Sequence, residues 1–320
     1  MNIYYDATKG ALGQITDLYD FIWPTVSAMW NLRWQIKGFV NEVGVENISV
    51  EDLNKRFDWG SKIHGVNLKR AYLDQSWEIQ QERFAKILLT NLFSIHESWL
   101  ADIQSILIFN DRTLKILQFP TRYDANSVAV DGVIFGVQQI RANLSVPLRD
   151  AFYNRLITNR KYSMSHLDNL LKCYRFFKES RNCITHNGGK ADQKLIDSYL
   201  VFQPVATIAD LGLAEVPVYI PPVLGSPVAF SLRGVVGFSD VIIRIITTLD
   251  AELSYALNAE SELISRCQNW ANSHPGNLRF RDRQKSFEER TRSLLSSCSF
   301  PPAAISLGVQ QLLQQDGIIL

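Results

Sequence analysis

Apolar residues recur at helical spacing along most of the chain, and this pattern predicts a mainly α-helical fold. The longest run extends from about Glu82 to Phe109, with apolar residues at every third or fourth position. Because the apolar stripe is wide, we expect this helix to lie at the centre of a bundle. Shorter helices are expected at residues 134–144, 148–157, 165–186, 194–202 and 235–257.

The N-terminal part of the chain also has a helical pattern. Residues 11–43 carry aromatic and aliphatic side chains at helical spacing, and Pro24 is expected to kink or split this run. Ser49, followed three residues later by Asp52, has the pattern of a capping box at the start of another helix. Since large aromatic residues are mostly buried, we expect the tryptophans here to form core rather than a base-stacking surface.

Two segments depart from the helical pattern. Glycine, proline, asparagine and aspartate cluster between residues 119 and 132, which predicts a loop. Residues 216–232 mix four prolines with β-branched and aromatic residues, which predicts a small hairpin or an irregular cover. The resulting division is an N-terminal helical region at residues 1–80, a helical bundle with a small β or irregular insertion at 81–260, and a polar C-terminal extension at 261–320.

Charge is unevenly distributed along this chain of 320 residues. The net charge is only +1, so bulk electrostatic coating of nucleic acid is excluded. Between Arg149 and Lys190, however, nine basic residues face three acidic ones, which makes this segment +6 and the remainder −5. A local basic face on a nearly neutral protein indicates a confined anionic ligand rather than a long polyanion.

Several classes of site are not indicated by the sequence. The four cysteines have no paired spacing, so we predict neither a zinc site nor a disulfide framework. The first ten residues lack the layout of a signal peptide, and charges interrupt every apolar stretch before 18 residues. We therefore expect a cytoplasmic protein that has no membrane partner and needs no metal or other cofactor.

The string FFKESRNCITHNGGK at residues 176–190 carries the most chemical information. It places Arg181, Asn182 and His186 at the end of a basic helix, and Gly188-Gly189 follows directly as a helix stop. Arg160 and His166 form a second arginine–histidine pair. That pair has lysine after the arginine, and its histidine is expected to begin a helix instead of ending one.

The string resembles the signature of the HEPN ribonuclease superfamily, in which an arginine, usually followed by a polar residue, precedes a histidine by four to six positions. The resemblance covers residues 81–260, and Glu97 stands on the preceding central helix, where many members carry an acid. It implies a HEPN-like helical bundle and a metal-independent RNA endonuclease, such as a toxin or an anti-phage effector. It further implies RNA as the partner, a homodimer that brings two motifs into one cleft, and an antitoxin or defence-system partner.

The chemistry of the motif residues fits this implication. Histidine can accept the 2′-hydroxyl proton or protonate the leaving 5′-oxygen near neutral pH, and we assign this role to His186. The guanidinium of Arg181 would stabilise the charge of the phosphorane transition state. Asn182 lies four residues before His186, on the same helix face, and could orient the imidazole or hold a phosphate oxygen. Arg181 and His186 lie about 140° apart around an ideal helix, so one chain brings them together poorly.

Three further residues are candidates for supporting roles. Carboxylates are seldom buried unless paired, so Glu97 either emerges on a polar strip or has a cationic partner, for which Arg181 and His186 are the candidates. Lys178 and Arg175 are candidates for phosphate contacts, and plain surface positions are the alternative for both.

Two other functions compete with RNA cleavage. A non-catalytic HEPN-type module could use the same basic face to bind RNA, a nucleotide or a protein partner. A DNA-binding regulator would rest on the basic residues between 50 and 75, but this segment has no convincing helix-turn-helix turn.

Overall fold

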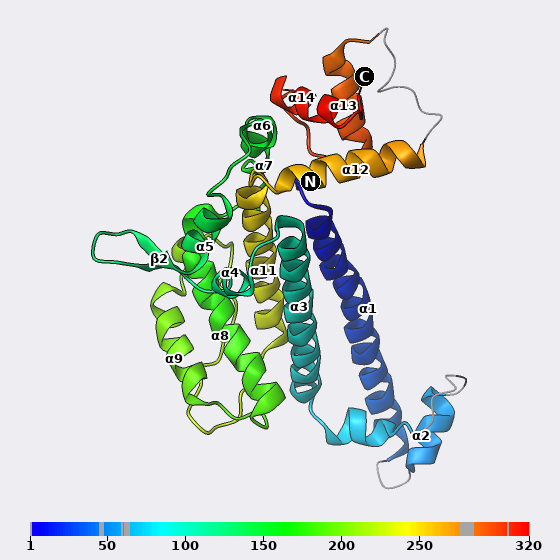
Figure 1. Cartoon of the computed structure of the whole chain (residues 1–320). Coiled ribbons are helices and arrows are strands. Elements are labelled where there is room, and N and C mark those ends of the chain that lie inside the picture. The colour runs from blue at the N-terminus through cyan, green and yellow to red at the C-terminus, as the bar shows by residue number, and fades with distance from the viewer. Residues whose placement is uncertain are drawn as a thin grey trace.

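The computed structural model describes residues 2–44, 48–58, 60, 65–274, 285–305 and 307–319. The predicted mainly α-helical fold is confirmed (Figure 1). Among these residues, the only strands are β1 (Arg122–Tyr123) and β2 (Ala129–Asp131), which form an antiparallel hairpin inside the segment predicted as a loop. The major helices are α1 (Asp6–Val43), α3 (Trp77–Leu107), α8 (Leu167–His186), α9 (Gln193–Phe202), α11 (Leu232–Leu253) and α12 (Ala259–Ser273).

The long helices pack in an order that differs from their order in the sequence. α1 packs on α3, α3 on α11, α11 on α8, and α8 on α9, as Figure 1 shows. α11 is buried around most of its circumference, because it lies between α3 and α8. α3 is bordered by both α1 and α11, which agrees with its predicted central position.

A buried polar network joins the start of α1 to α3 and α11. The Asp250 carboxylate on α11 accepts hydrogen bonds from the backbone N–H groups of Tyr4 and Tyr5, at 2.8 and 3.0 Å. The hydroxyl of Thr8 accepts a hydrogen bond from the Trp99 indole N–H at 2.8 Å and also bonds to Asp250. Burial raises the pKa of Asp250 to about 6, so desolvation outweighs the hydrogen bonds that favour its charged form.

Helix α1 excludes one of the two outcomes expected at Pro24 and contradicts the expected burial of its tryptophans. It runs without interruption through Pro24, which therefore does not split it. Pro24 and Asp20 both face solvent, so water can bond the carbonyl that the proline leaves without a donor. The tryptophans of this helix were expected in the core, but Trp23, Trp30 and Trp34 are 44%, 39% and 56% exposed.

The connecting segments differ from the sequence predictions in detail. The helix expected from residue 165 begins at Leu167, because a 3₁₀ turn at Met164–His166 precedes α8; neither Ser165 nor another side chain caps the helix. Asp168 instead accepts the backbone N–H of Thr121, at 2.8 Å. The proline-rich cover at residues 216–232 is irregular and forms no strand up to the start of α11. The capping box of Ser49 and Asp52 is confirmed at the start of α2 (Val50–Phe57).

The remaining helices are short. Between α3 and α8 lie α4 (Asp111–Ile116), α5 (Val133–Ile140), α6 (Val146–Leu148), a π-helical turn (Arg149–Tyr153) and α7 (Asn154–Leu156). A π-helical turn (Arg70–Asp74) precedes α3, and a 3₁₀ turn (Gln203–Val205) and α10 (Ile208–Leu211) follow α9. α13 (Phe287–Ser297) and α14 (Leu307–Gln315) lie beyond α12 (Figure 1).

Two hydrophobic cores stabilise the chain. The main core includes residues from all three predicted regions, from Tyr4 near the N-terminus to Ile319. A smaller core forms between the end of α1, α2 and the turn before α3, around Ile36, Leu53 and Tyr72. The division of the chain into three regions, with boundaries at residues 80 and 260, remains a prediction. No helix in the described part of the chain combines the length and apolar character that a membrane span requires.

Candidate functional site

The candidate site lies where α8 packs beside α3. Leu170, Leu171, Tyr174 and Phe177 bury one face of α8, so Lys178 and Arg181 lie at the edge of the packed surface. Nη2 of Arg181 is 2.8 Å from Oε1 of Glu97 on α3. The side chain of Arg181 is 17% exposed and that of Glu97 is 41% exposed. Glu97 therefore combines both expected alternatives, because it reaches solvent and has a cationic partner.

Lys178 shares the same carboxylate. Its Nζ lies 3.3 Å from Oε1 of Glu97 and donates a 2.6 Å hydrogen bond to Oε1 of Gln118. Burial lowers the pKa of Lys178, although Glu97 opposes the effect. One acid thus holds two neighbouring cations at the surface of the helix pair.

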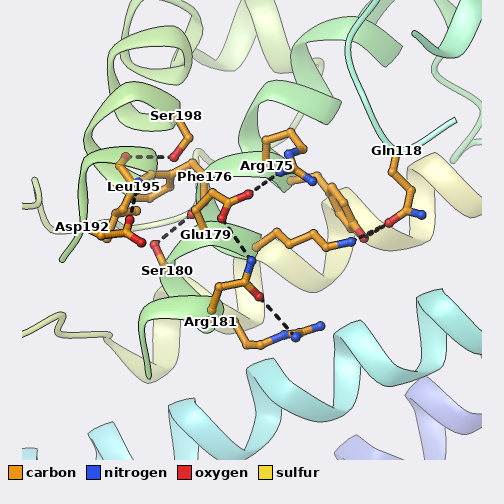
Figure 2. A network of polar contacts seen from close by, with 12 residues as sticks. Gln118, Arg175, Phe176, Glu179, Ser180, Arg181, Asp192, Leu195 and Ser198 are labelled. Carbon is orange, nitrogen blue, oxygen red and sulfur yellow. Dashed lines mark hydrogen bonds and ion pairs between the residues drawn. The ribbon is translucent and has the colours of Figure 1, made fainter. Parts of the chain in front are cut away.

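Arg175 continues the network along α8 (Figure 2). Its guanidinium forms an ion pair with Glu179 and lies over the Phe119 ring, 4.2 Å from the centroid. Glu179 also accepts a 3.0 Å hydrogen bond from Nδ2 of Asn182. The three cations Arg175, Lys178 and Arg181 therefore face two carboxylates, and the cluster keeps a net charge of +1.

The guanidinium of Arg181 is held on several sides. Besides the ion pair with Glu97, Nη1 donates a 3.3 Å hydrogen bond to Oδ1 of Asn182, and the group lies 5.2 Å from the Phe93 ring centroid. Its Nε is buried and meets no hydrogen-bond acceptor within the described residues. These contacts fix the orientation of the cation before any ligand binds, as stabilisation of developing charge requires.

His186 is the last residue of α8, as the sequence predicts. It is exposed, and no hydrogen bond links its ring to the described residues. Gly188 and Gly189 follow with φ angles of 59° and 79°, values at which glycine is favoured. The N–H groups of Asn187 and Gly189 both bond to the carbonyl oxygen of Cys183, so the helix ends in a tight turn that presents His186 to solvent.

The structure brings together Glu97, Arg175, Lys178, Arg181 and Asn182, but it does not bring His186 to them. α8 is continuous from Leu167 to His186, so Arg181 and His186 are about 7.5 Å apart along the axis and about 140° apart around it. The amide of Asn182 bonds to Glu179 and Arg181 and does not orient the imidazole. A single chain therefore presents a fixed cation and a free imidazole in different directions.

The histidine of α3, His96, belongs to the core beneath the site. Its Nδ1 is 3.1 Å from the hydroxyl of Tyr174. Burial lowers the pKa of His96 to about 3 and raises the pKa of Tyr174, so both groups are neutral at physiological pH. This pair supports the packing of α3 against α8 and is unsuited to proton transfer near neutral pH.

Two residues of the cluster were not identified from the sequence. Glu179 lies four residues after Arg175, and this helical ion-pair spacing could have revealed it. Gln118 follows α4 and accepts a hydrogen bond from Lys178, 60 residues later in the chain. No local sequence pattern predicts this contact. The second arginine–histidine pair does not join the cluster: Nδ1 of His166 lies 3.2 Å from the carbonyl oxygen of Asp210 on α10.

Among the described residues, no three histidine, cysteine, aspartate or glutamate side chains form a possible metal-binding group. Comparisons with family models, with curated proteins and with solved structures give no match for this chain.

Proposed function

We propose that the chain is a metal-independent RNA endonuclease in which Arg181 stabilises the phosphate transition state and His186 transfers a proton. The observation that carries the proposal is the 2.8 Å ion pair between Arg181 and Glu97. This contact fixes the largely buried side chain of Arg181 on the helix whose last residue is an exposed histidine. The local arrangement suits an anionic ligand that needs both a fixed cation and a proton carrier.

The proposed reaction forms one bond and breaks one. The 2′-oxygen of the RNA attacks phosphorus, the bond to the 5′-oxygen breaks, and the products are a 2′,3′-cyclic phosphate and a 5′-hydroxyl. His186 either takes the 2′-hydroxyl proton or gives a proton to the leaving oxygen, and its exposure at the end of α8 leaves it accessible to RNA. Arg181 contributes positive charge to the pentavalent phosphorus centre.

In the proposed reaction, Lys178 and Arg175 act mainly by adding positive charge to the cluster, which attracts the RNA phosphate. Both are already paired, Lys178 with Glu97 and Gln118, and Arg175 with Glu179. A phosphate group would share or replace these partners, and the net positive charge of the cluster favours that exchange. The resemblance to HEPN proteins further suggests a toxin or an anti-phage effector, an associated antitoxin or defence partner, and a cytoplasmic setting.

A non-catalytic anion-binding module is the second candidate. It is favoured by one specific observation, which is that Arg181 and His186 do not share a face of α8. In that case the basic cluster would bind RNA, a nucleotide or an acidic partner, and His186 would be a plain helix-ending residue. Binding of RNA without cleavage would support this candidate over the first.

The deciding experiment combines purified protein with total RNA in the presence of EDTA, with wild type beside His186→Ala. We expect the wild type to cut RNA and leave 5′-hydroxyl and 2′,3′-cyclic or 3′ phosphate ends, because Arg181 and His186 supply the charge and the proton transfer. The variant should lose at least about 10²-fold in rate, the range typical for a proton-transfer group. Strict dependence of cleavage on added magnesium would rule out the proposed mechanism.

A further inference from the structure

Two cysteines far apart in the sequence meet where α12 contacts α13. Cys267 lies on α12, and Cys298 directly follows the last residue of α13. Their thiols are close enough to affect each other's titration, and the Cys298 thiol lies 3.9 Å from the carbonyl oxygen of Arg266, to which it donates a hydrogen bond. Arg266 fixes the contact, since its Nη2 donates a 2.7 Å hydrogen bond to the carbonyl oxygen of Cys298 and its guanidinium lies 3.7 Å from the Phe300 ring centroid.

The two thiols differ in their access to solvent. Cys267 is fully buried, whereas Cys298 is 8% exposed and lines an open surface hollow of about 470 Å³. Lys9 and Arg266 also line this hollow, where both form ion pairs with Asp6. A small oxidant can therefore reach Cys298 first, with Cys267 directly behind it.

The surroundings also favour the thiolate at Cys298. The interaction with the Cys267 thiol lowers the pKa of Cys298 and outweighs the opposing effect of burial; the charges of Arg266 and Lys9 lower this pKa further, and that of Asp6 raises it. The same interaction and burial raise the pKa of Cys267. Burial likewise raises the pKa of Cys173 and of Cys183. Cys298 is thus the one cysteine of the chain whose environment favours the reactive form.

We propose that Cys298 and Cys267 form a thiol pair that hydroperoxides oxidise to a disulfide, with Cys298 as the attacking and Cys267 as the resolving residue. The Cys298 thiolate attacks the hydroxyl oxygen of the peroxide, the O–O bond breaks, and hydroxide (from hydrogen peroxide) or alkoxide (from an alkyl hydroperoxide) leaves while Cys298 becomes a sulfenic acid. The Cys267 sulfur then attacks the sulfenic sulfur, loses its proton, and displaces hydroxide, which leaves as water. Two thiols are oxidised to one disulfide, and one hydroperoxide is reduced to two waters, or to one alcohol and one water.

The disulfide would tie α13 to α12 by a covalent bond. It would close the loop between residues 267 and 298, and a cross-link of this kind restricts the unfolded chain. The oxidised protein should therefore melt at a higher temperature than the reduced protein. This site is separate from the α3–α8 cluster, so the proposal does not depend on the proposed RNA cleavage.

The test exposes the full-length reduced protein to hydrogen peroxide and then blocks free thiols after denaturation. Peptide mass spectrometry should find Cys267 linked to Cys298, while Cys173 and Cys183 stay free thiols and serve as internal controls. In native protein, Cys298 should react with peroxide at least about 10-fold faster than Cys173, because only the thiolate is nucleophilic. A rate for Cys298 no higher than that for Cys173, or a disulfide between other cysteines, would overturn the proposal.

Two variants separate the proposed roles. Cys267→Ser should still form the sulfenic acid at Cys298, trapped as a dimedone adduct, because the attacking residue remains. Cys298→Ser should leave Cys267 reduced at the same peroxide concentration, and neither variant should show the rise in melting temperature. Circular dichroism of both reduced variants checks that they are folded, and oxidation of Cys267 in folded Cys298→Ser would contradict the assigned order.

Discussion

Arg181 Nη2 lies 2.8 Å from Oε1 of Glu97, across the contact between α8 and α3. This ion pair joins a residue of the predicted catalytic motif to an acid 84 positions earlier in the chain. Because the Arg181 side chain is 17% exposed and the Glu97 side chain 41% exposed, the pair is partly screened by solvent. Its main effect is to hold the cation in one orientation.

Replacing Glu97 should therefore lower RNA cleavage without removing it. We expect Glu97→Ala to lose about 10-fold in kcat, because a charge-assisted hydrogen bond contributes about 1.5 kcal/mol at the low end of its range. Glu97→Gln, which keeps an acceptor for Arg181, should lose less. Glu215→Ala removes an exposed ion pair with Arg233 and is the matched control. Equal rates for Glu97→Ala and this control would show that Glu97 does not position Arg181.

Replacing His166 and replacing His186 should have very different effects on RNA cleavage, although each histidine follows an arginine by five or six residues. His166 packs against Gly212, where an added Cβ would come within 2.4 Å of its ring, and its Nδ1 contacts the carbonyl oxygen of Asp210. His166→Ala should lower the melting temperature but keep cleavage within a few-fold of wild type. His186→Ala and Arg181→Ala should each lose at least about 10²-fold in rate. Cleavage that depends on His166 instead would show that the site is assigned to the wrong pair.

The buried carboxylate of Asp250 should make stability depend on pH. Its pKa is about 6 in the folded chain and 3.8 as an ordinary value, so folding favours the protonated form. The contribution of this group is complete below pH 3.8 and is lost as pH rises through about 6. Since each pKa unit corresponds to about 1.4 kcal/mol, the change is on the order of 2 to 3 kcal/mol.

Asp250→Asn tests this contribution, because asparagine has a similar shape and does not titrate. We expect the difference in unfolding free energy, wild type minus variant, to be larger at pH 4.5 than at pH 7.5. Denaturant unfolding of both proteins at several pH values measures it. A difference that stays constant across this range would mean that Asp250 does not titrate there.

The sequence predicted those features of the site that depend on local order. The end of α8 at His186 follows from the asparagine and two glycines after it, and both glycines have positive φ angles. An ion pair of Glu97 with a basic residue could be expected, because burying a carboxylate on an apolar helix is unfavourable unless it is paired. Gln118 could not be predicted, since its contact with Lys178 depends on how the segment that follows α4 lies against α8.

The exposed tryptophans and the paired cysteines show two other limits of sequence analysis. Trp30 and Trp34 have a helical spacing that fits burial, but the hydrophobic pattern does not say whether another element covers that face of α1. Cys267 and Cys298 have no recognisable spacing, because their contact results from the packing of α12 and α13. In both cases tertiary packing determines which side chains are exposed or in contact, and local sequence patterns do not predict that packing.

The geometry of α8 leads to a prediction about assembly. Arg181 and His186 point about 140° apart on one continuous helix, so a phosphate served by both residues requires two chains. We expect a two-fold dimer whose cleft holds both motifs. Two basic segments of charge +6 repel each other, so apolar surface elsewhere must hold the dimer, and RNA should stabilise it. Raised salt should weaken RNA binding more than dimerisation.

Mixing two inactive variants tests the shared cleft. Arg181→Ala and His186→Ala chains should each be inactive alone, whereas their mixture should regain part of the wild-type rate. At equal amounts, random exchange makes about half of the dimers mixed, and each mixed dimer keeps one intact arginine–histidine combination. The control is a mixture of wild type with a chain that carries both Arg181→Ala and His186→Ala, which shows how the rate changes when wild-type chains pair with inactive ones. Full activity of a wild-type protein shown to be monomeric would refute the shared cleft, and it would require α8 to break near Arg181 so that one chain supplies both groups.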